Sequence, residues 1–364
     1  MTKKKNYPGM FDLIKGYAMI TIVVVHTLYL APFDSLPGNI PPVLFGLMGA
    51  LITFLLICHP LMPLFFMISG YSFSATSMKK CIKKQTHILL KPYLITALFT
   101  VIVFFFSQLA HTGELWESAV ATSRTALRYL LGVPEQTMFF GIQLKAIGAI
   151  WYVLALFIGW LLLNAITLYV PERLRPLTVF ACVCTGYLIG QNFIALFCLS
   201  QGFVSVGFLY AGQLMKKNDW LFGKLSIPCW CVLIFLSLFS FLFGDFDMAS
   251  SSYKYGLLDM AGVGCYAFLL ARGAVLLNQY SNALTDRLRK IGRYSLWVMC
   301  AHTVESNGLF WGVFAKRFGE HQWIAFFTIV ILRFILVFFM CQMVIKYNKI
   351  RSKRKRSARQ HSLK

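Results

Sequence analysis

Long apolar segments recur along the whole chain, and they restrict it to a membrane fold. Hydrophobic residues make up 58% of the 364 residues and charged residues only 13%, which leaves too little polar surface for a soluble domain of this length. Many segments approach or exceed about 18 residues, the length that crosses the hydrocarbon core of a bilayer. We therefore predict an all-α, polytopic membrane helical bundle over residues 1–345, with about ten transmembrane helices. The candidate spans lie near residues 13–31, 56–77, 88–110, 149–169, 176–192, 194–215, 225–244, 256–277, 294–313 and 323–345.

The distribution of basic residues predicts how this bundle is oriented. The net charge is +22, and the cytoplasmic loops of membrane proteins carry an excess of Lys and Arg. If the N-terminus is cytoplasmic and the spans alternate, 25 of the 35 basic residues fall inside and six fall outside. Both termini are therefore expected to be cytoplasmic, and residues 346–364 are expected to form a basic tail that contacts anionic lipid. Because topology explains the charge, we do not expect nucleic acid as a partner.

Several other features receive structural interpretations. The apolar stretch 43–58 runs into prolines in "CHPLMP", so it is either an extension of the second span or a re-entrant segment. The long outer loop at 111–148 contains "ELWESAVATSRTALRYLL", which fits an amphipathic helix over the mouth of the bundle.

The C-x-C pairs at 182–184 and 229–231 lack a neighbouring His/Cys cluster, so we predict packing roles and no metal site. No small-residue cleavage site follows the first apolar segment, so we expect no cleavable signal peptide.

Two polar side chains, Lys15 and His26, interrupt the first apolar segment. Eleven residues at 100° each end about 20° beyond three full turns and rise about 16 Å, so both side chains share one face of a helix. Lys15 would lie at the cytoplasmic edge, where Asp12 can hold it in a local ion pair, and His26 would lie in the outer half of the membrane. The spacing leaves two interpretations open for each. Lys15 either snorkels to the headgroups or binds a ligand, and His26 either makes a packing hydrogen bond or belongs to a site.

The second span and the segment after it offer hydroxyl and ammonium groups near the cytoplasmic face. Ser69 and Tyr71 flank Gly70, which permits a close backbone approach. A basic loop follows with Lys79, Lys80, Lys83 and Lys84. These lysines are either an ordinary positive-inside loop or a site for phosphate groups.

Titratable residues also interrupt the last two spans. His302 and Glu305 are three residues apart and share a helix face, so Glu305 either orients an imidazole or ties two helices together. Arg333 lies in the middle of "TIVILRFILVF". Because an unpaired arginine at that depth is costly, we expect it to have a partner such as Glu305 or Asp259.

Five motifs follow one another along nearly the whole chain: "FDLIKGYAMITIVVVH", "PLFFMISGYSF", a basic loop ending in Pro-Tyr, "IWYVLALFIG" and "IGRYSLWVMCAH". Their order and spacing resemble the acyltransferase-3 family of integral membrane acyltransferases, in its stand-alone form without an extracytoplasmic hydrolase domain. Lys15 and His26 match the family's Arg/Lys-x10-His pattern. The chain departs from the family in the basic loop, where it has only lysines and where His87 and Ile88 replace a common basic pair. The other matching positions are Asp12, Gly16, Phe65, Phe66, Ser69, Gly70, Tyr71, Trp151, Gly292, Ser295 and His302.

The resemblance implies a membrane O-acyltransferase, expected to be an O-acetyltransferase, that moves an acyl group from cytoplasmic acyl-CoA to a hydroxyl at the outer side. The acceptor is expected to be a cell-surface glycan, a glycolipid or a small molecule, and the compartment a bacterial plasma membrane. His26 would be the general base or a transient acyl carrier, with Lys15 as its catalytic partner. The acyl-CoA contacts would be Lys15, Ser69, Tyr71, Lys80, Lys83 and Lys84, and the supporting residues Asp12, Trp151, His302, Glu305 and Arg333.

Two other functions stay open on the sequence alone. A transporter or lipid-linked sugar carrier could use the buried Lys, His and Glu as a substrate path, although the chain shows no pair of broken helices in matching halves. A relative that handles small molecules such as amino acids is the other alternative. Thioester consumption separates the acyltransferase from the carrier.

Overall fold

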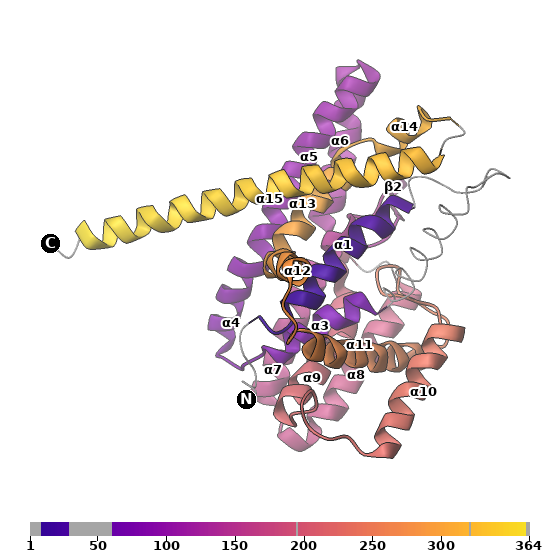
Figure 1. Ribbon diagram of the computed structural model, residues 1–364. Coiled ribbons are helices and arrows are strands. Elements are labelled where there is room, and N and C mark those ends of the chain that lie inside the picture. Colours follow the sequence, from indigo (N-terminus) through magenta and orange to yellow (C-terminus); the bar gives the residue numbers. More distant parts are fainter. Residues whose placement is uncertain (1–8, 29–59, 194–195, 320–321, 362–364) are drawn as a thin grey trace.

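The computed structural model describes residues 9–28, 60–193, 196–319 and 322–361, which form an almost entirely helical molecule (Figure 1). The apolar stretch 43–58 lies outside these residues. In chain order the helices are α1 (Asp12–Leu28), α3 (Leu61–Tyr71), α4 (Met78–Gln85), α5 (Lys91–Thr112), α6 (Leu115–Leu131), α7 (Trp151–Tyr169), α8 (Arg175–Asn192), α9 (Leu199–Lys217), α10 (Ile227–Phe243), α11 (Leu257–Leu277), α12 (Ala283–Arg293), α13 (Ser295–Gly308), α14 (Trp311–Lys316) and α15 (Gln322–His361).

Short elements link these helices. A π-helical turn, η1 (Thr86–Leu90), joins α4 to α5, and 3₁₀ turns occur at η2 (Gly148–Ile150), η3 (Glu172–Leu174) and η4 (Leu196–Cys198). Two antiparallel hairpins pair β1 (Thr137–Phe139) with β2 (Ile142–Leu144) and β3 (Phe246–Asp247) with β4 (Ser252–Tyr253). Met138 lies opposite Gln143 in the first hairpin, and Phe246 lies opposite Tyr253 in the second.

Every predicted span contains one of the described helices, and the predicted all-α membrane bundle is confirmed. Among the described residues, four helical stretches are long and apolar enough to cross a bilayer: Met78–Thr112, Gly148–Tyr169, Leu257–Leu277 and Ile324–Tyr347. Two further apolar helices, α3 and α10, are shorter. The helix predicted in the long outer loop is present as α6, which packs along α5.

Three elements differ in detail from the sequence-based expectation. The segment of four lysines is helix α4 rather than a loop, because Cys81 and Gln85 repeat at i, i+4 and bury one face. The ninth span is interrupted, since α13 ends at Gly308 and α14 begins at Trp311. Helix α15 continues without a break through the tail as far as His361 and projects beyond the rest of the bundle (Figure 1).

Two helix crossings depend on glycines that let backbones touch. A Cβ on Gly70 of α3 would lie 1.9 Å from the Leu209 carbonyl oxygen of α9, and a Cβ on Gly292 of α12 would lie 1.8 Å from the Asp12 carbonyl oxygen of α1. Such distances exclude any side chain, so the backbones pack directly, as small residues permit in membrane bundles. These crossings fix the ends of α1 and α3 that carry Lys15 and Tyr71.

Candidate active site

Two histidines from distant parts of the chain meet inside the bundle. His26 Nδ1 on α1 lies 2.8 Å from His302 Nε2 on α13. The imidazole rings stack with their centroids 5.0 Å apart and their planes 20° apart. His302 is completely enclosed, with 1% of its surface exposed. This contact brings a candidate from the first span next to one from the ninth.

A carboxylate fixes the roles of the imidazole nitrogens. His302 Nδ1 lies 2.7 Å from Glu305 Oε1, one helical turn further along α13. Since an ionised carboxylate only accepts hydrogen bonds, His302 Nδ1 carries a hydrogen. With both rings neutral, His302 Nε2 is then an acceptor and His26 Nδ1 is the donor to it. The His26 Nε2 lone pair is left to accept a proton from another molecule.

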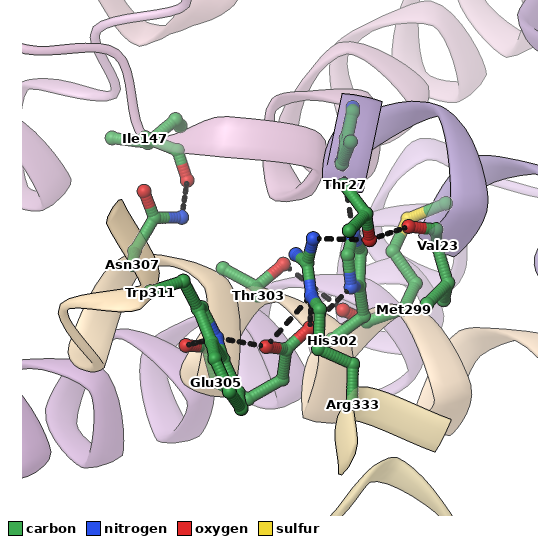
Figure 2. Close-up of polar contacts among 11 residues, drawn as sticks. Val23, Thr27, Ile147, Met299, His302, Thr303, Glu305, Asn307, Trp311 and Arg333 are labelled. Carbon is green, nitrogen blue, oxygen red and sulfur yellow. Dashed lines mark hydrogen bonds and ion pairs between the residues drawn. The ribbon is translucent and has the colours of Figure 1, made fainter. Parts of the chain in front are cut away.

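Arg333 of α15 balances the charge of Glu305. Its Nε lies 2.9 Å and 3.0 Å from the two carboxylate oxygens, and its Nη1 donates to Thr27 Oγ1 at 2.8 Å. Trp311 Nε1 donates to Glu305 Oε2 at 2.6 Å and to the Glu305 carbonyl oxygen at 3.0 Å. Figure 2 shows the guanidinium reaching both the carboxylate and Thr27, the residue next to His26. The ion pair leaves the two histidines in surroundings of zero net charge.

One donor in this cluster is unused among the described residues. Arg333 is fully buried, and its Nη2 has no hydrogen-bond partner there. A buried guanidinium donor without a partner is costly, because the group has lost its water. It is therefore a candidate for binding an oxygen of a ligand that enters the cluster.

The N-terminal end of α1 forms a separate charged group. Lys15 Nζ lies 2.7 Å from Asp12 Oδ1, which confirms the predicted ion pair, and Arg293 Nε at the end of α12 lies 3.7 Å from Asp12 Oδ2. Asp12 is buried while Lys15 keeps 23% of its side chain exposed. Eleven residues of helix place Lys15 about 16 Å from His26 along α1.

The end of α3 lies beside this charged group. Tyr71 is buried, and its ring meets the edge of Phe11, the residue before Asp12, at 5.3 Å and 80°. Ser69 lies two residues before Tyr71 in α3 and is half-buried. Trp151 packs its ring 6.4 Å from that of Phe66. The structure thus brings Tyr71 close to the Lys15 end, and it places Trp151 in the packing between α3 and α7.

The lysines of α4 are on the exposed face of a helix that packs against α7. Lys80, Lys83 and Lys84 are exposed, and Lys84 Nζ lies 5.9 Å over the ring of Trp160 on α7. Helix α4 packs against α7, whereas Lys15 lies where α1 crosses α12. The role of these three lysines in binding acyl-CoA therefore stays a prediction, and the basic neighbour that the structure gives Lys15 is Arg293.

Comparison with known proteins identifies the family. A family model described as an acyltransferase domain, that of the acyltransferase-3 family, matches residues 10–343. The chain belongs to the acyltransferase-3 family. No curated protein and no solved structure gives a match. The match begins just before Asp12 and ends within α15, so both the charged group and the histidine cluster lie inside the acyltransferase domain.

In an acyltransferase, the arrangement of His26, His302 and Glu305 suits a general base that is held in place by two neighbours. A nucleophile or its base is commonly held by a second residue, which is in turn oriented by a third. Here His26 is held by His302, and His302 by Glu305. Among the described residues no group of three His, Cys, Asp or Glu side chains is arranged to hold a metal ion.

Sequence reasoning missed three members of these groups. Thr27 accepts a hydrogen bond from Arg333, and Trp311 donates one to Glu305. Arg293 is the second basic residue near Asp12. The position of Thr27 next to His26 was a local signal for its role. Trp311 gave none, because its contact depends on the chain turning back after α13 ends at Gly308.

Proposed function

We propose that this membrane acyltransferase is an O-acyltransferase that moves an acyl group, acetyl in the simplest case, from cytoplasmic acyl-CoA to a hydroxyl of an acceptor at the outer side. The acceptor would be a cell-surface glycan, a glycolipid or a small molecule, and the membrane a bacterial plasma membrane. The observation that carries the proposal is the buried chain of hydrogen bonds from His26 through His302 to Glu305.

The proposed reaction follows from which nitrogens of His26 and His302 carry a hydrogen. His26 Nε2 accepts the hydroxyl proton as the acceptor oxygen attacks the thioester carbonyl carbon. A C–O bond forms, the C–S bond breaks, and the CoA thiolate takes the proton from His26 to leave as the thiol. Glu305 and His302 stabilise the transient His26 cation through their hydrogen bonds. Arg333 Nη2, which has no partner in the described part of the chain, is suited to hold the oxyanion of the tetrahedral intermediate.

The donor would bind at the other end of α1. Lys15 and Arg293 form a basic group around Asp12 at the predicted cytoplasmic surface, which suits the phosphates of CoA. Ser69 and Tyr71 would line the same end of the bundle, with Lys80, Lys83 and Lys84 available for the CoA head. The pantetheine arm would then extend about 16 Å along α1 toward His26.

Proteoliposomes supplied with acetyl-CoA test the reaction. With a panel of hydroxyl acceptors, free CoA thiol should appear only when a suitable acceptor is present. His26→Ala should abolish the release at normal protein levels, and His111→Ala, an exposed histidine at the end of α5, should retain it. No release with any acceptor would contradict the proposal. Acceptor movement across the bilayer in that case would identify a carrier, and release with amino acids alone would identify a small-molecule enzyme.

A second measurement separates the two roles open to His26. Incubation with radiolabelled acetyl-CoA in the absence of acceptor, followed by rapid quenching, would trap label on the His26 peptide if the imidazole carries the acyl group. No label on the protein, with normal turnover when acceptor is added, would identify His26 as a general base.

A further inference from the structure

A polar pocket of about 280 Å³ opens beyond the ends of the helices, on the side predicted to be outside. Four segments form it: the turn after α6, the C-terminal end of α8, the start of α9 and the tip of the β3–β4 hairpin. The lining residues are 133–137, 190–193 and 249–251, with Leu196 and Gln201. It is separate from the histidine cluster, and the mechanism above does not use it.

A buried glutamine builds the inner wall of this outer pocket. Gln201 is 1% exposed, and its Nε2 donates to the Ala249 carbonyl at 2.9 Å and to Ser251 Oγ at 3.2 Å. Gln191 Nε2 donates to the Ser251 carbonyl, and Ser200 Oγ lies 2.9 Å from Ser251 Oγ. The hairpin tip is therefore held rigidly. Gln201 Oε1, by contrast, has no hydrogen-bond partner among the described residues.

The rim adds exposed carboxylate and amide groups. Glu135 and Gln136 line one side, and Asn192 lines the other. Partial burial and the nearby Asp247 carboxylate raise the pKa of Glu135 above its usual value. The exposed ring of Phe193 supplies a flat apolar surface at the same rim.

The composition of the lining selects a class of ligand. No Lys, Arg or His occurs among the described lining residues, so an anion such as phosphate would find no cation to bind. Amide and carboxylate groups can each bond two neighbouring hydroxyls, and Gln201 Oε1, which no described residue satisfies, requires a donor. Together with an aromatic face, these groups fit a neutral ring that carries several hydroxyls.

Two hydrogen bonds connect the outer pocket to the helix that bears the catalytic cluster. Ile147 N donates to the Val133 carbonyl at 2.9 Å, and Asn307 Nδ2 of α13 donates to the Ile147 carbonyl at 3.1 Å (Figure 2). Asn307 is two residues beyond Glu305. The pocket wall at Val133 is thus linked through Ile147 to Asn307, near the C-terminal end of α13.

We propose that the outer pocket binds a neutral polyhydroxylated ring, a sugar or a similar polyol, as part of the acyl acceptor. The role as acceptor site rests on the proposed function, whereas the class of ligand rests on the pocket alone. Gln201 Oε1 accepts a hydroxyl hydrogen, Glu135 and Asn192 bind neighbouring hydroxyls, and Phe193 stacks on the ring.

Saturation-transfer NMR with a panel of neutral methyl glycosides tests the pocket directly. The full-length protein should be extracted and kept in polymer nanodiscs, because glycoside detergents would compete. Wild-type protein should transfer saturation to at least one glycoside. Gln201→Leu and Glu135→Ala should reduce the signal at least fivefold, and Gln143→Ala, an exposed glutamine on β2 outside the pocket, should not.

Each outcome decides one question. If no glycoside binds the wild-type protein, the ligand class is wrong. If binding survives both Gln201→Leu and the rim variant Glu135→Ala, which removes an exposed side chain and should not affect folding, the site is wrong. If a glycoside binds here but no acceptor releases CoA, the proposed function fails while the sugar site stands. If the pocket variants raise the KM for the acceptor without changing the KM for acetyl-CoA, both are supported.

Discussion

His26 Nδ1 lies 2.8 Å from His302 Nε2, although 276 residues separate the two histidines in the chain. In the proposed reaction this contact makes His302 a positioning residue, because His302 sets the tautomer of His26 while Glu305 sets the tautomer of His302. A single buried histidine could turn between several partners. Held by a second imidazole, His26 would present one nitrogen, Nε2, to the acceptor hydroxyl of the proposed reaction.

Replacing His302 should therefore slow the chemical step. His302→Leu removes the acceptor for His26 Nδ1, and we expect kcat for acyl transfer to fall about 10²–10⁴-fold, the range of general acid–base effects, with the KM for acetyl-CoA unchanged. His302→Gln, which can keep a polar group near the Nε2 position, should recover part of kcat. His111→Leu is the control. Wild-type kcat in His302→Leu, or no difference between Leu and Gln, would contradict the positioning role.

The buried ion pair of Arg333 with Glu305 should contribute strongly to the stability of the bundle where α13 packs on α15. Removing one partner by Glu305→Ala or Arg333→Ala leaves an unpaired buried charge, which costs about 3–5 kcal/mol. Thermal unfolding in detergent measures this, with Asp286→Ala as the control, since the exposed pair of Asp286 with Arg289 is expected to contribute about 0–1 kcal/mol.

The exchanged pair Glu305→Arg with Arg333→Glu separates folding from function. It should restore much of the thermal stability, because the two charges again meet. It should not restore acyl transfer, since position 305 could no longer accept the hydrogen of His302 Nδ1. Recovery of activity in the exchanged protein would show that Glu305 has only a structural role.

Local rules predict some of this site from the sequence. The i, i+3 spacing of His302 and Glu305 and the cost of an unpaired Arg333 both lead to contacts that the structure contains. The i, i+3 pair of Asp12 and Lys15 is of the same kind. The first and third pairs lie on a single helix, so their spacing predicts the contact. For Arg333, few buried acidic residues are available as partners in the described part of the chain.

Contacts between distant segments could not be predicted in this way. The meeting of His26 and His302 depends on how α1 packs against α13, which no local pattern encodes. The pocket around Gln201 depends on four segments that meet only in the folded molecule. The packing of α4 on α7 is a further contact between segments, made by the buried Cys81 face of that helix, and the role of Lys80, Lys83 and Lys84 in binding the donor stays a prediction.

Lys15 should act on binding of the donor rather than on the chemistry. Lys15→Gln removes one cation from the N-terminal end of α1, and loss of one charge-assisted hydrogen bond costs about 1.5–3 kcal/mol. We therefore expect the KM for acetyl-CoA to rise about tenfold or more with little change in kcat, and the rise of KM with salt to become weaker. Lys254→Gln, at the outer hairpin, is the control. An unchanged KM would mean that Lys15 only snorkels to the headgroups.

The crossing of α1 and α12 should tolerate no side chain at Gly292. A Cβ there would lie 1.8 Å from the Asp12 carbonyl oxygen, so Gly292→Ala must push α12 away from α1. Overpacking of this kind costs about 1–3 kcal/mol or more, and it should also raise the KM for acetyl-CoA, because Asp12 pairs with Lys15.

Gly273 of α11 provides the matched control, since a Cβ at that position meets nothing within 4 Å. Alanine is the better helix former by about 0.5–1 kcal/mol, so Gly273→Ala should leave the midpoint of thermal unfolding unchanged or raise it slightly. Gly292→Ala should lower that midpoint and weaken donor binding in the same preparation. If both variants unfold like the wild type and bind acetyl-CoA equally well, the close crossing does not hold the donor end of α1 in place.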